Sequence, residues 1–318
     1  MTTRAEVTEI AVEASRLSGI PQRHFEKDYY VTQALRAIFA EMSDRVIFKG
    51  GTSLSKAYSL IDRFSEDIDL LIDPPATLDN AAGINSILDR IVELAVEGIG
   101  GEVTTREMKR EDGLASKTNL KPIYGSAKQS GISSDIQIES GRRGGPMPTD
   151  RRPISPMATK YMDLDAPDFA DFDVVVLHPA RTLLEKLLAV DGLGRRLLGA
   201  SDEKVSGRAA RHFYDIHALL DETSPAHDYL RENTGATTEL IRDCEAITTR
   251  WYGAQQEPFE GSLSDSSVFL DDSIQVKLSE AYARTCSELC YPDAAVPSWA
   301  EVLDRVQLNR EILTVIPS

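Results

Sequence analysis

The sequence predicts an α/β (α+β) fold in which a mixed sheet with helices is followed by a mainly helical second region. Two observations support this prediction. In the first half, short apolar or alternating runs such as Val174–Leu177 are interspersed with stretches of helical period, whereas the second half is helical in period almost throughout. Because the composition changes near His178, we expect a first domain over residues 1–177 and a second over residues 178–318.

The expected elements follow in chain order from apolar periodicity and from Gly and Pro breaks. Helices are expected at 5–18, 23–42, 54–61, 82–96, 180–191 and 208–220. Strands are expected at 45–48, 65–72, 132–139 and 174–177, with further short strands between 102 and 138. The stretch 141–156 is rich in Gly, Pro and Arg and is expected to form a loop.

The net charge taken as a sum argues against a nucleic-acid partner, but the distribution of charge along the chain does not. The 318 residues include 35 Lys and Arg against 51 Asp and Glu, a net charge of −16 that excludes a basic nucleic-acid wrapper. Residues 101–152 hold ten basic and seven acidic residues (+3), whereas residues 216–318 carry −11. An RNA substrate near the basic segment is therefore compatible with the sequence.

Other classes of protein are less compatible with the composition. The apolar fraction of 42% is too high for a disordered chain. The apolar runs are too short to span a bilayer, and the first residues lack a secretory apolar segment, so we expect no membrane partner and a cytoplasmic protein. Three cysteines do not make a disulfide framework, and we interpret them as structural thiols.

One segment combines a glycine turn with paired acids. Gly50-Gly51-Thr52-Ser53 lies between a strand and a helix, where backbone N–H groups and hydroxyls can bind phosphate, and Lys56 follows one turn later. Asp67 and Asp69 alternate with Ile68 on the next strand, so their carboxylates share one face. A divalent cation such as Mg²⁺ would relieve their repulsion and bind phosphate oxygens as well. The combination is typical of nucleotidyl transfer, although each part alone is commonly a plain turn or a solvated strand.

A third carboxylate is expected where metal ions serve such a transfer. Asp135 and Glu139 both alternate with Ile in ISSDIQIE, and they share a strand face. We favour Asp135, because Glu139 borders the Gly- and Arg-rich stretch. Either acid remains an alternative at this point.

These residues carry a family resemblance. KGGTSLSKAYSLIDRFSEDIDLLI at residues 49–72 resembles the signature of the AbiEii/AbiGii-type nucleotidyltransferase toxins, relatives of the mycobacterial MenT toxins within the DNA polymerase β-like superfamily. EKDYYVTQAL, HPARTLLEKLLAV and RHFYDIHAL resemble further motifs of the family, so the resemblance covers roughly residues 20–220. It implies a polymerase-β-like mixed sheet followed by a helical lobe.

The resemblance also implies roles for individual residues. Those implied to bind the nucleotide are Gly50, Gly51, Thr52, Ser53, Lys56, Arg63, Ser65, Lys186 and Arg211. Those implied to be catalytic are Asp67, Asp69, Asp135, Lys186 and Asp215, of which Asp67, Asp69 and Asp135 would bind Mg²⁺ or Mn²⁺. Lys186 and Asp215 would come from the helical lobe.

The function implied is that of a toxin in an abortive-infection toxin–antitoxin system. Such a toxin would move a nucleotide from an NTP (CTP, another pyrimidine NTP, or GTP) to the 3′ end of tRNA and so block aminoacylation. Its partner would be an AbiEi-like antitoxin. Two alternatives remain: nucleotidylation of a protein or small-molecule hydroxyl, and a catalytically idle module that binds GTP or the antitoxin. The intact paired acids argue against the idle module, and Arg142 and Arg143 favour RNA.

Overall fold

The computed structural model describes residues 2–108, 115–122, 135–142, 144–199, 205–252 and 259–316. The chain divides into two compact units. The first comprises Met1–Ser59, Phe64–Arg142 and Thr149–Leu177, and the second comprises Leu60–Arg63, Arg143–Pro148 and His178–Ser318. The two short segments thus belong to the second unit, although they precede the main division after Leu177.

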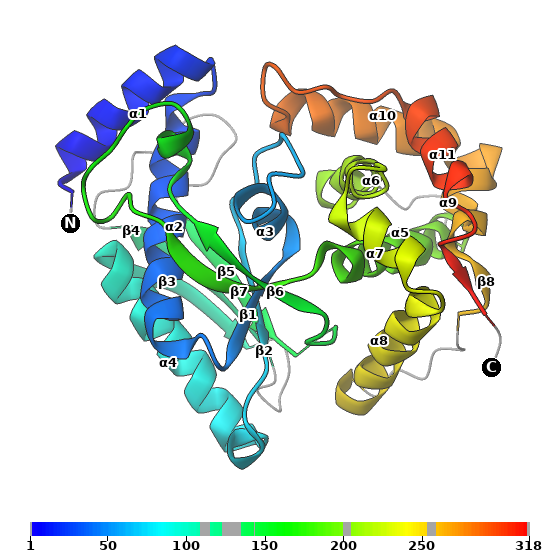
Figure 1. Cartoon of the computed structure of the whole chain (residues 1–318), viewed down its shortest axis with the longest axis horizontal. Helices are drawn as coiled ribbons and strands as arrows, with labels where there is room; N and C mark the ends of the chain where they lie inside the picture. Colours follow the sequence, from blue (N-terminus) through cyan, green and yellow to red (C-terminus); the bar gives the residue numbers. More distant parts are fainter. Residues whose placement is uncertain are drawn as a thin grey trace. The chain divides into compact units, whose positions relative to one another are not determined.

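A seven-stranded mixed sheet forms the centre of the first unit, in the order β3-β4-β5-β2-β1-β7-β6 (Figure 1). The strands are β1 (Val46–Lys49), β2 (Ile68–Ile72), β3 (Gly101–Met108), β4 (Ala115–Pro122), β5 (Ile136–Gly141), β6 (Thr149–Ile154) and β7 (Phe172–Leu177). The pairs β1–β7 and β2–β5 are parallel, and the other neighbouring strands are antiparallel. The mixed sheet confirms the predicted fold class.

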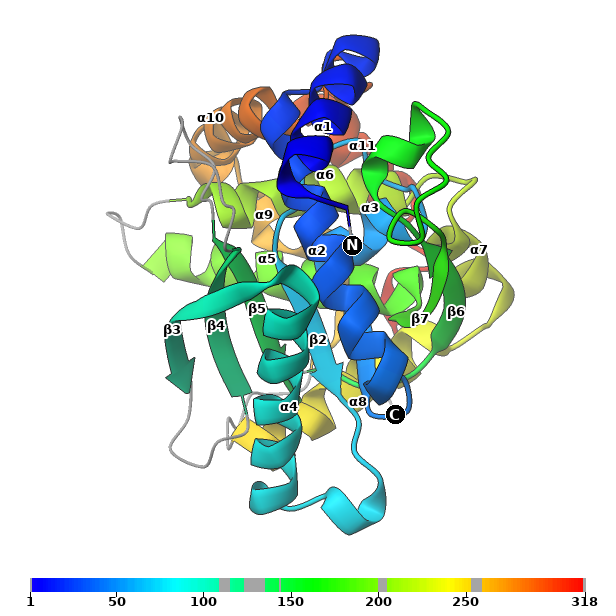
Figure 2. The same cartoon turned by 90° about the vertical axis from the view of Figure 1, so that its left-hand side faces the viewer.

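Helices cover one face of this sheet. The first unit contains α1 (Arg4–Ser18), α2 (Gln22–Met42), α3 (Gly50–Lys56) and α4 (Ala81–Ile99). Figure 2 shows α2 and α4 in front of the sheet, and both pack on each other and on its strands. Ile68 and Leu70 of β2 and Ile138 of β5 are almost fully buried on that face. Residues that alternate with them, Asp69 and Glu139 included, therefore lie on the opposite face.

The predicted loop at 141–156 is wrong in its second part. Residues Thr149–Ile154 form β6, an edge strand that pairs antiparallel with β7 in the register Asp150↔Val176. Arginines and Pro153 hid this strand in the sequence, yet an edge strand tolerates both, because its outer side needs no backbone partner. The helix expected at 54–61 is also shifted, since α3 begins directly at Gly50 and ends at Lys56.

The second unit is mainly helical, as predicted. Its helices are α5 (Pro179–Gly199), α6 (Gly207–Leu219), α7 (Pro225–Glu232), α8 (Ala236–Tyr252), α9 (Ser267–Leu270), α10 (Asp272–Leu289) and α11 (Trp299–Leu308). A small antiparallel pair, β8 (Gly261–Ser262) and β9 (Thr314–Val315), accompanies them. Helix α5 packs on α6, α7, α8 and α9, and the Phe213 ring of α6 meets Trp299 of α11 at 4.9 Å between centroids. Among the described residues, no helix is long and apolar enough to cross a membrane.

Candidate active site

The glycine turn joins β1 directly to α3. Gly50 has φ +76°, a left-handed conformation that glycine adopts without strain. A Cβ atom at this position would lie 2.1 Å from Oδ2 of Asp69, so only glycine leaves room for that carboxylate. The turn therefore brings backbone N–H groups and the Asp69 carboxylate to one place.

The two hydroxyls of the turn have partners within the first unit. Thr52 Oγ1 donates to the backbone oxygen of Asp67 at 2.5 Å and lies 3.0 Å from Ser65 Oγ. Ser53 Oγ donates to the backbone oxygen of Gly50 at 2.9 Å. Both side chains are almost fully buried. The Thr52 bond fixes the turn to the segment that carries the acids, whereas the Ser53 bond lies within the turn. Backbone N–H groups of the turn are the donors that would serve a phosphate.

The register of the sheet sets two acids beside each other. β2 and β5 run parallel with Asp69 opposite Glu139, and β1 places Lys49 on the other side of Asp69. Asp67 comes directly before β2 and alternates with Ile68. The carboxylates of Asp69 and Glu139 thus project from neighbouring strands on the face that α2 and α4 leave open.

Asp135 lies elsewhere on the same strand. It precedes β5, and its Oδ2 accepts a hydrogen bond from Thr104 Oγ1 at 3.1 Å. Four residues of extended chain, about 13 Å, separate it from Glu139. The strand register therefore favours Glu139 over Asp135 as the acid next to Asp69.

Glu139 also has two polar neighbours on the open face. Gln137 Nε2 donates to Glu139 Oε1 at 2.9 Å, and Lys117 Nζ of β4 lies 3.5 Å from the same oxygen. Neither neighbour was predicted from the sequence. The alternation along β5 was a signal for Gln137, because it places Gln137 on the same face as Glu139. Lys117 lies on β4, and the sequence does not reveal how β4 pairs.

The acids offer the oxygen ligands that Mg²⁺ requires. Within the described parts of the chain, no three His, Cys, Asp or Glu side chains gather closely enough to form a complete metal site. Mg²⁺ is commonly held by one or two protein carboxylates together with substrate phosphates and water. Asp69, with its carboxylate against the Gly50 turn, fits that pattern, because phosphate and carboxylate oxygens would meet there.

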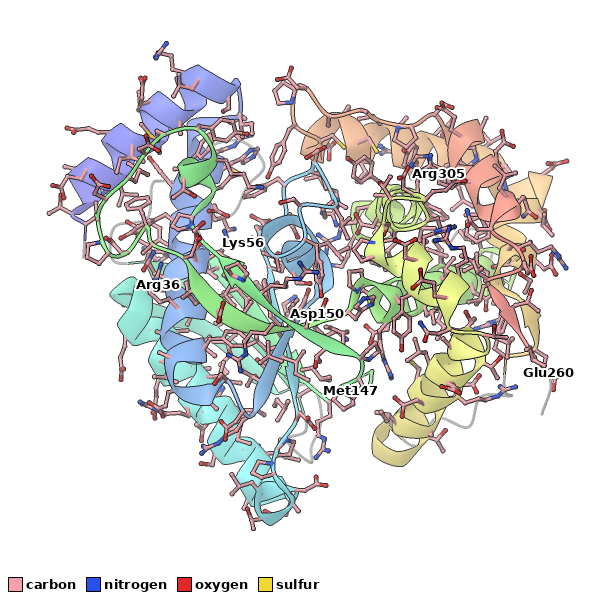
Figure 3. The ribbon with its side chains drawn as sticks, viewed as in Figure 1. Arg36, Lys56, Met147, Asp150, Glu260 and Arg305 are labelled. Carbon is pink, nitrogen blue, oxygen red and sulfur yellow. The ribbon has the colours of Figure 1, made fainter. Side chains whose placement is uncertain are left out.

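Lys56 is turned away from the turn. Its ammonium group lies 2.6 Å from Asp28 Oδ1 of α2 and donates to the backbone oxygen of Ser155 at 3.1 Å. Figure 3 shows Lys56 in the region between α2 and α3. Burial lowers the pKa of Lys56, and the charge of Asp28 opposes that shift. This lysine ties α3 to α2, and the sequence prediction that it binds nucleotide has no support in its contacts.

The second unit holds a separate cluster around Asp215. Arg63 Nε and Nη2 donate to Oδ1 and Oδ2 of Asp215, each at 2.7 Å, and Lys186 Nζ lies 2.7 Å from Oδ2. The Asp215 side chain is fully buried, and those of Arg63 and Lys186 are 1% and 8% exposed. We name Arg63, Lys186 and Asp215 the α6 ion cluster. Two cations around one carboxylate give it a charge of +1.

Electrostatics within the α6 ion cluster keep Asp215 ionised. Burial alone would raise the pKa of Asp215, but the charges of Arg63 and Lys186 outweigh burial and lower that pKa. Burial lowers the pKa of Lys186, and Asp215 opposes the change. His212 Nδ1 lies 3.4 Å from Lys186 Nζ, and burial together with that cation holds the pKa of His212 well below its usual range. His212 is therefore neutral at pH 7, and the sequence motif gave no signal for its position beside Lys186.

The arginines that the sequence analysis singled out differ in their surroundings. Arg211, one turn before Asp215 on α6, is partly buried and close enough to Lys186 to lower its pKa. Arg142 pairs with Asp79, and its side chain is only 12% exposed. Arg143 lies outside the described residues. Arg63, which was expected to bind nucleotide, instead has its guanidinium bonded to Asp215.

Comparisons with known proteins identify the family and a similar fold. A model of the family "Nucleotidyl transferase AbiEii toxin, Type IV TA system" matches residues 33–305. The fold is similar to that of MenT4, a nucleotidyltransferase toxin from Mycobacterium tuberculosis H37Rv, with a TM-score of 0.56 and 19% identity over 100% of this chain and 91% of that one. A candidate nucleotidyltransferase from H. pylori gives a TM-score of 0.40 and 16% identity over 88% and 93% of the two chains.

No curated protein matches this chain at a significant level. The family model, however, spans most of the sequence, including the glycine turn, the acids of β2 and β5, and the α6 ion cluster. Membership implies an NTP substrate and an antitoxin. The chain belongs to the AbiEii family of nucleotidyltransferase toxins of type IV toxin–antitoxin systems.

Proposed function

We propose that the chain transfers a nucleoside monophosphate from an NTP to the 3′ end of tRNA, which blocks aminoacylation. One observation carries the chemical part of this proposal: Asp69 and Glu139 are register neighbours on one sheet face, and the Asp69 carboxylate touches the Gly50 turn. This arrangement brings a phosphate-binding turn next to carboxylates, as nucleotidyl transfer requires.

The turn and the acids have distinct tasks in this proposal. Backbone N–H groups of Gly51 and its neighbours hold the triphosphate. Asp67 and Asp69 hold Mg²⁺ or Mn²⁺, which supplies charge neutralisation at the phosphates when it is bound. Thr52 keeps the two parts in register, because its hydroxyl ties the turn to the backbone of Asp67.

The proton of the attacking hydroxyl needs an acceptor. We assign this role to Glu139, which replaces Asp135 in the proposal because Asp135 lies about 13 Å further along the strand. The hydroxyl oxygen bonds to the α-phosphorus, the bond to the bridging oxygen breaks, and pyrophosphate leaves. The proton passes to the Glu139 carboxylate.

The α6 ion cluster supports a phosphate-binding role for Lys186. Its single carboxylate is already bonded by two guanidinium nitrogens of Arg63, Nε and Nη2, and the cluster keeps a net positive charge in a buried setting. Burying a charge is costly unless the charge is paired, and an anionic ligand such as a phosphate would pair with the excess positive charge. We therefore assign Lys186 to the NTP phosphates and assign Arg63 and Asp215 to positioning it.

The acceptor and the partner rest on the family resemblance. We propose tRNA as the acceptor, an AbiEi-like protein as the antitoxin and the cytoplasm as the location. The ion pair between Arg142 and Asp79 removes one argument for RNA contact by the 141–156 stretch.

One experiment tests the proposal and its alternatives. The protein is incubated with each α-labelled NTP, Mg²⁺, and either total tRNA or a lysate depleted of RNA. We expect label on tRNA with one or a few of the NTPs, and none with Asp69→Asn. Label on protein or on a small molecule alone would overturn the tRNA assignment. Absence of transfer with all four NTPs, or transfer unchanged in Asp69→Asn, would overturn the chemistry.

A further inference from the structure

A row of neutral polar side chains crosses the sheet beside the acids. Gln137 of β5 pairs with Asn119 of β4, and Asn119 pairs with Thr105 of β3. Asn119 Nδ2 donates to Thr105 Oγ1 at 2.6 Å. We name Gln137, Asn119 and Thr105 the amide row. A second row, formed by the charged residues Asp69, Glu139 and Lys117, runs beside it across the sheet. The two rows are two residues apart along β5 and β4, so they share one face of the sheet.

The amide row lies on the face of the sheet opposite α2 and α4. Gln137 alternates with the buried Ile136 and Ile138, and Asn119 alternates with the fully buried Thr118 and Leu120. Gln137 and Asn119 are partly exposed, and Thr105 is exposed. The amide row therefore shares its face with Glu139 and is accessible to a ligand.

The order of the strands sets the direction from which an acceptor must approach. The triphosphate turn follows β1, the paired acids are on β2, and β5, β4 and β3 follow on the far side of β2. In phosphoryl and nucleotidyl transfer the attacking and leaving oxygens are roughly in line. With the triphosphate at the turn, as proposed above, pyrophosphate would leave toward β1, and an attacking hydroxyl in line with it would come from the side of β5 and β4, where Glu139 and the amide row lie.

We propose that the amide row holds the terminal nucleotide of the acceptor RNA through hydrogen bonds to its sugar and base. This inference rests on the proposed function, since it places the acceptor at Glu139. Each carboxamide has two N–H donors and an acceptor oxygen. The bonds described for Asn119 and Gln137 use one N–H group of each. The remaining groups match sugar hydroxyls and base edges, which both donate and accept.

The charges around Asn119 favour a nucleotide over a polypeptide. Lys117 and Lys121 stand two residues before and after Asn119 on the same strand face, at roughly 7 Å each. Lys117 already lies beside Glu139, so the exposed Lys121 is the cation suited to a phosphate next to a sugar and base held by Asn119. Phosphate contacts come from Lys and Arg, while amides read sugars and bases. A peptide backbone carries no such charges.

The test compares Asn119→Ala with a matched amide elsewhere in the first unit. Gln22→Ala serves as the control, because Gln22 begins α2 and, like Gln137, donates one bond to a glutamate, Glu26, at 2.7 Å. The probe is a 5′-fluorescein RNA hairpin with an unpaired 3′-CCA end. Its Kd is measured by anisotropy without NTP, and KM values for hairpin and NTP are measured separately.

We expect Asn119→Ala to raise both the Kd and the KM for the hairpin about tenfold, as the loss of one or two hydrogen bonds implies. The KM for NTP should stay unchanged, and Gln22→Ala should behave as wild type. A hairpin Kd within twofold of wild type, or an increase in the KM for NTP instead, would overturn the inference. Wild-type transfer to RNA that depends on Asp69 would still uphold the proposed function in either case.

Discussion

Removing the carboxylate of Asp215 from the α6 ion cluster should lower the stability of the protein far more than removing the ammonium group of Lys186. Asp215→Asn would remove the carboxylate that the buried Arg63 and Lys186 share, whereas Lys186→Met would leave a neutral, doubly bonded Arg63–Asp215 pair. Breaking a buried ion pair by removing one partner costs about 3–5 kcal/mol when an uncompensated charge is left behind. Lys186→Met leaves Asp215 compensated by Arg63, so we expect a much smaller cost. The pKa of Lys186 is already lowered by burial, so its removal also relieves a desolvation cost.

Urea unfolding measures this difference directly. Both tryptophans of the chain belong to the second unit, so their fluorescence reports on the unit that contains the cluster. With a slope of about 2 kcal/mol per M, Asp215→Asn should lower the midpoint by about 2 M. Lys186→Met should shift it by less than about 0.5 M, since its cost is about 1 kcal/mol or less. Equal shifts for the two variants would refute the charge count.

The pH dependence of stability below neutral pH is a second test of the α6 ion cluster. The pKa of Asp215 is lower in the folded than in the unfolded protein, so the unfolded chain takes up the proton first as the pH falls. The stabilisation is therefore complete above about pH 4 and is lost progressively below it. In Asp215→Asn this part of the pH dependence should disappear, and an unaltered acid profile would contradict the assignment.

Three further predictions concern the first unit. Glu139→Gln should lower the rate of nucleotide transfer in a labelled-NTP assay at least a hundredfold. Asp135→Asn, the matched control, should stay near the wild-type rate. A large loss with Asp135→Asn and a small one with Glu139→Gln would restore Asp135 as the third acid. Gly50→Ala should abolish transfer, because its Cβ would displace the Asp69 carboxylate and the left-handed backbone costs roughly 1–2 kcal/mol; activity above a tenth of wild type would argue against a tight turn. Arg142→Ala should leave the salt dependence of RNA binding unchanged, because Asp79 already pairs with this arginine; a slope reduced by about one would show a phosphate contact.

The sequence predicted the parts of the fold that follow from local patterns. The alternation of Asp67, Ile68 and Asp69 placed both acids on one strand face, and the Gly50-Gly51 pair marked the turn. The change in composition near His178 marked the beginning of the helical unit, whose first helix, α5, begins at Pro179. The edge strand β6 was missed because its composition resembles a loop, and only its pairing with β7 makes it a strand.

Side-chain partners could not be read from the sequence in the same way. Asp135 and Glu139 have the same spacing pattern, and the parallel register of β2 and β5, a long-range property, distinguishes them. Lys56 looked available for phosphate until the fold brought Asp28 beside it. Thr52 and Ser53 are in the expected place, but their hydroxyls bond to backbone oxygens rather than being directed to a ligand.

The most direct test of the central claim is the fate of two labels in one NTP. We expect label at the α-phosphate to appear in the RNA, label at the γ-phosphate to be released as pyrophosphate, and the two amounts to be equal. Transfer of the γ-label to the acceptor, or release of pyrophosphate with no α-label in RNA, would contradict nucleotidyl transfer to RNA by this chain.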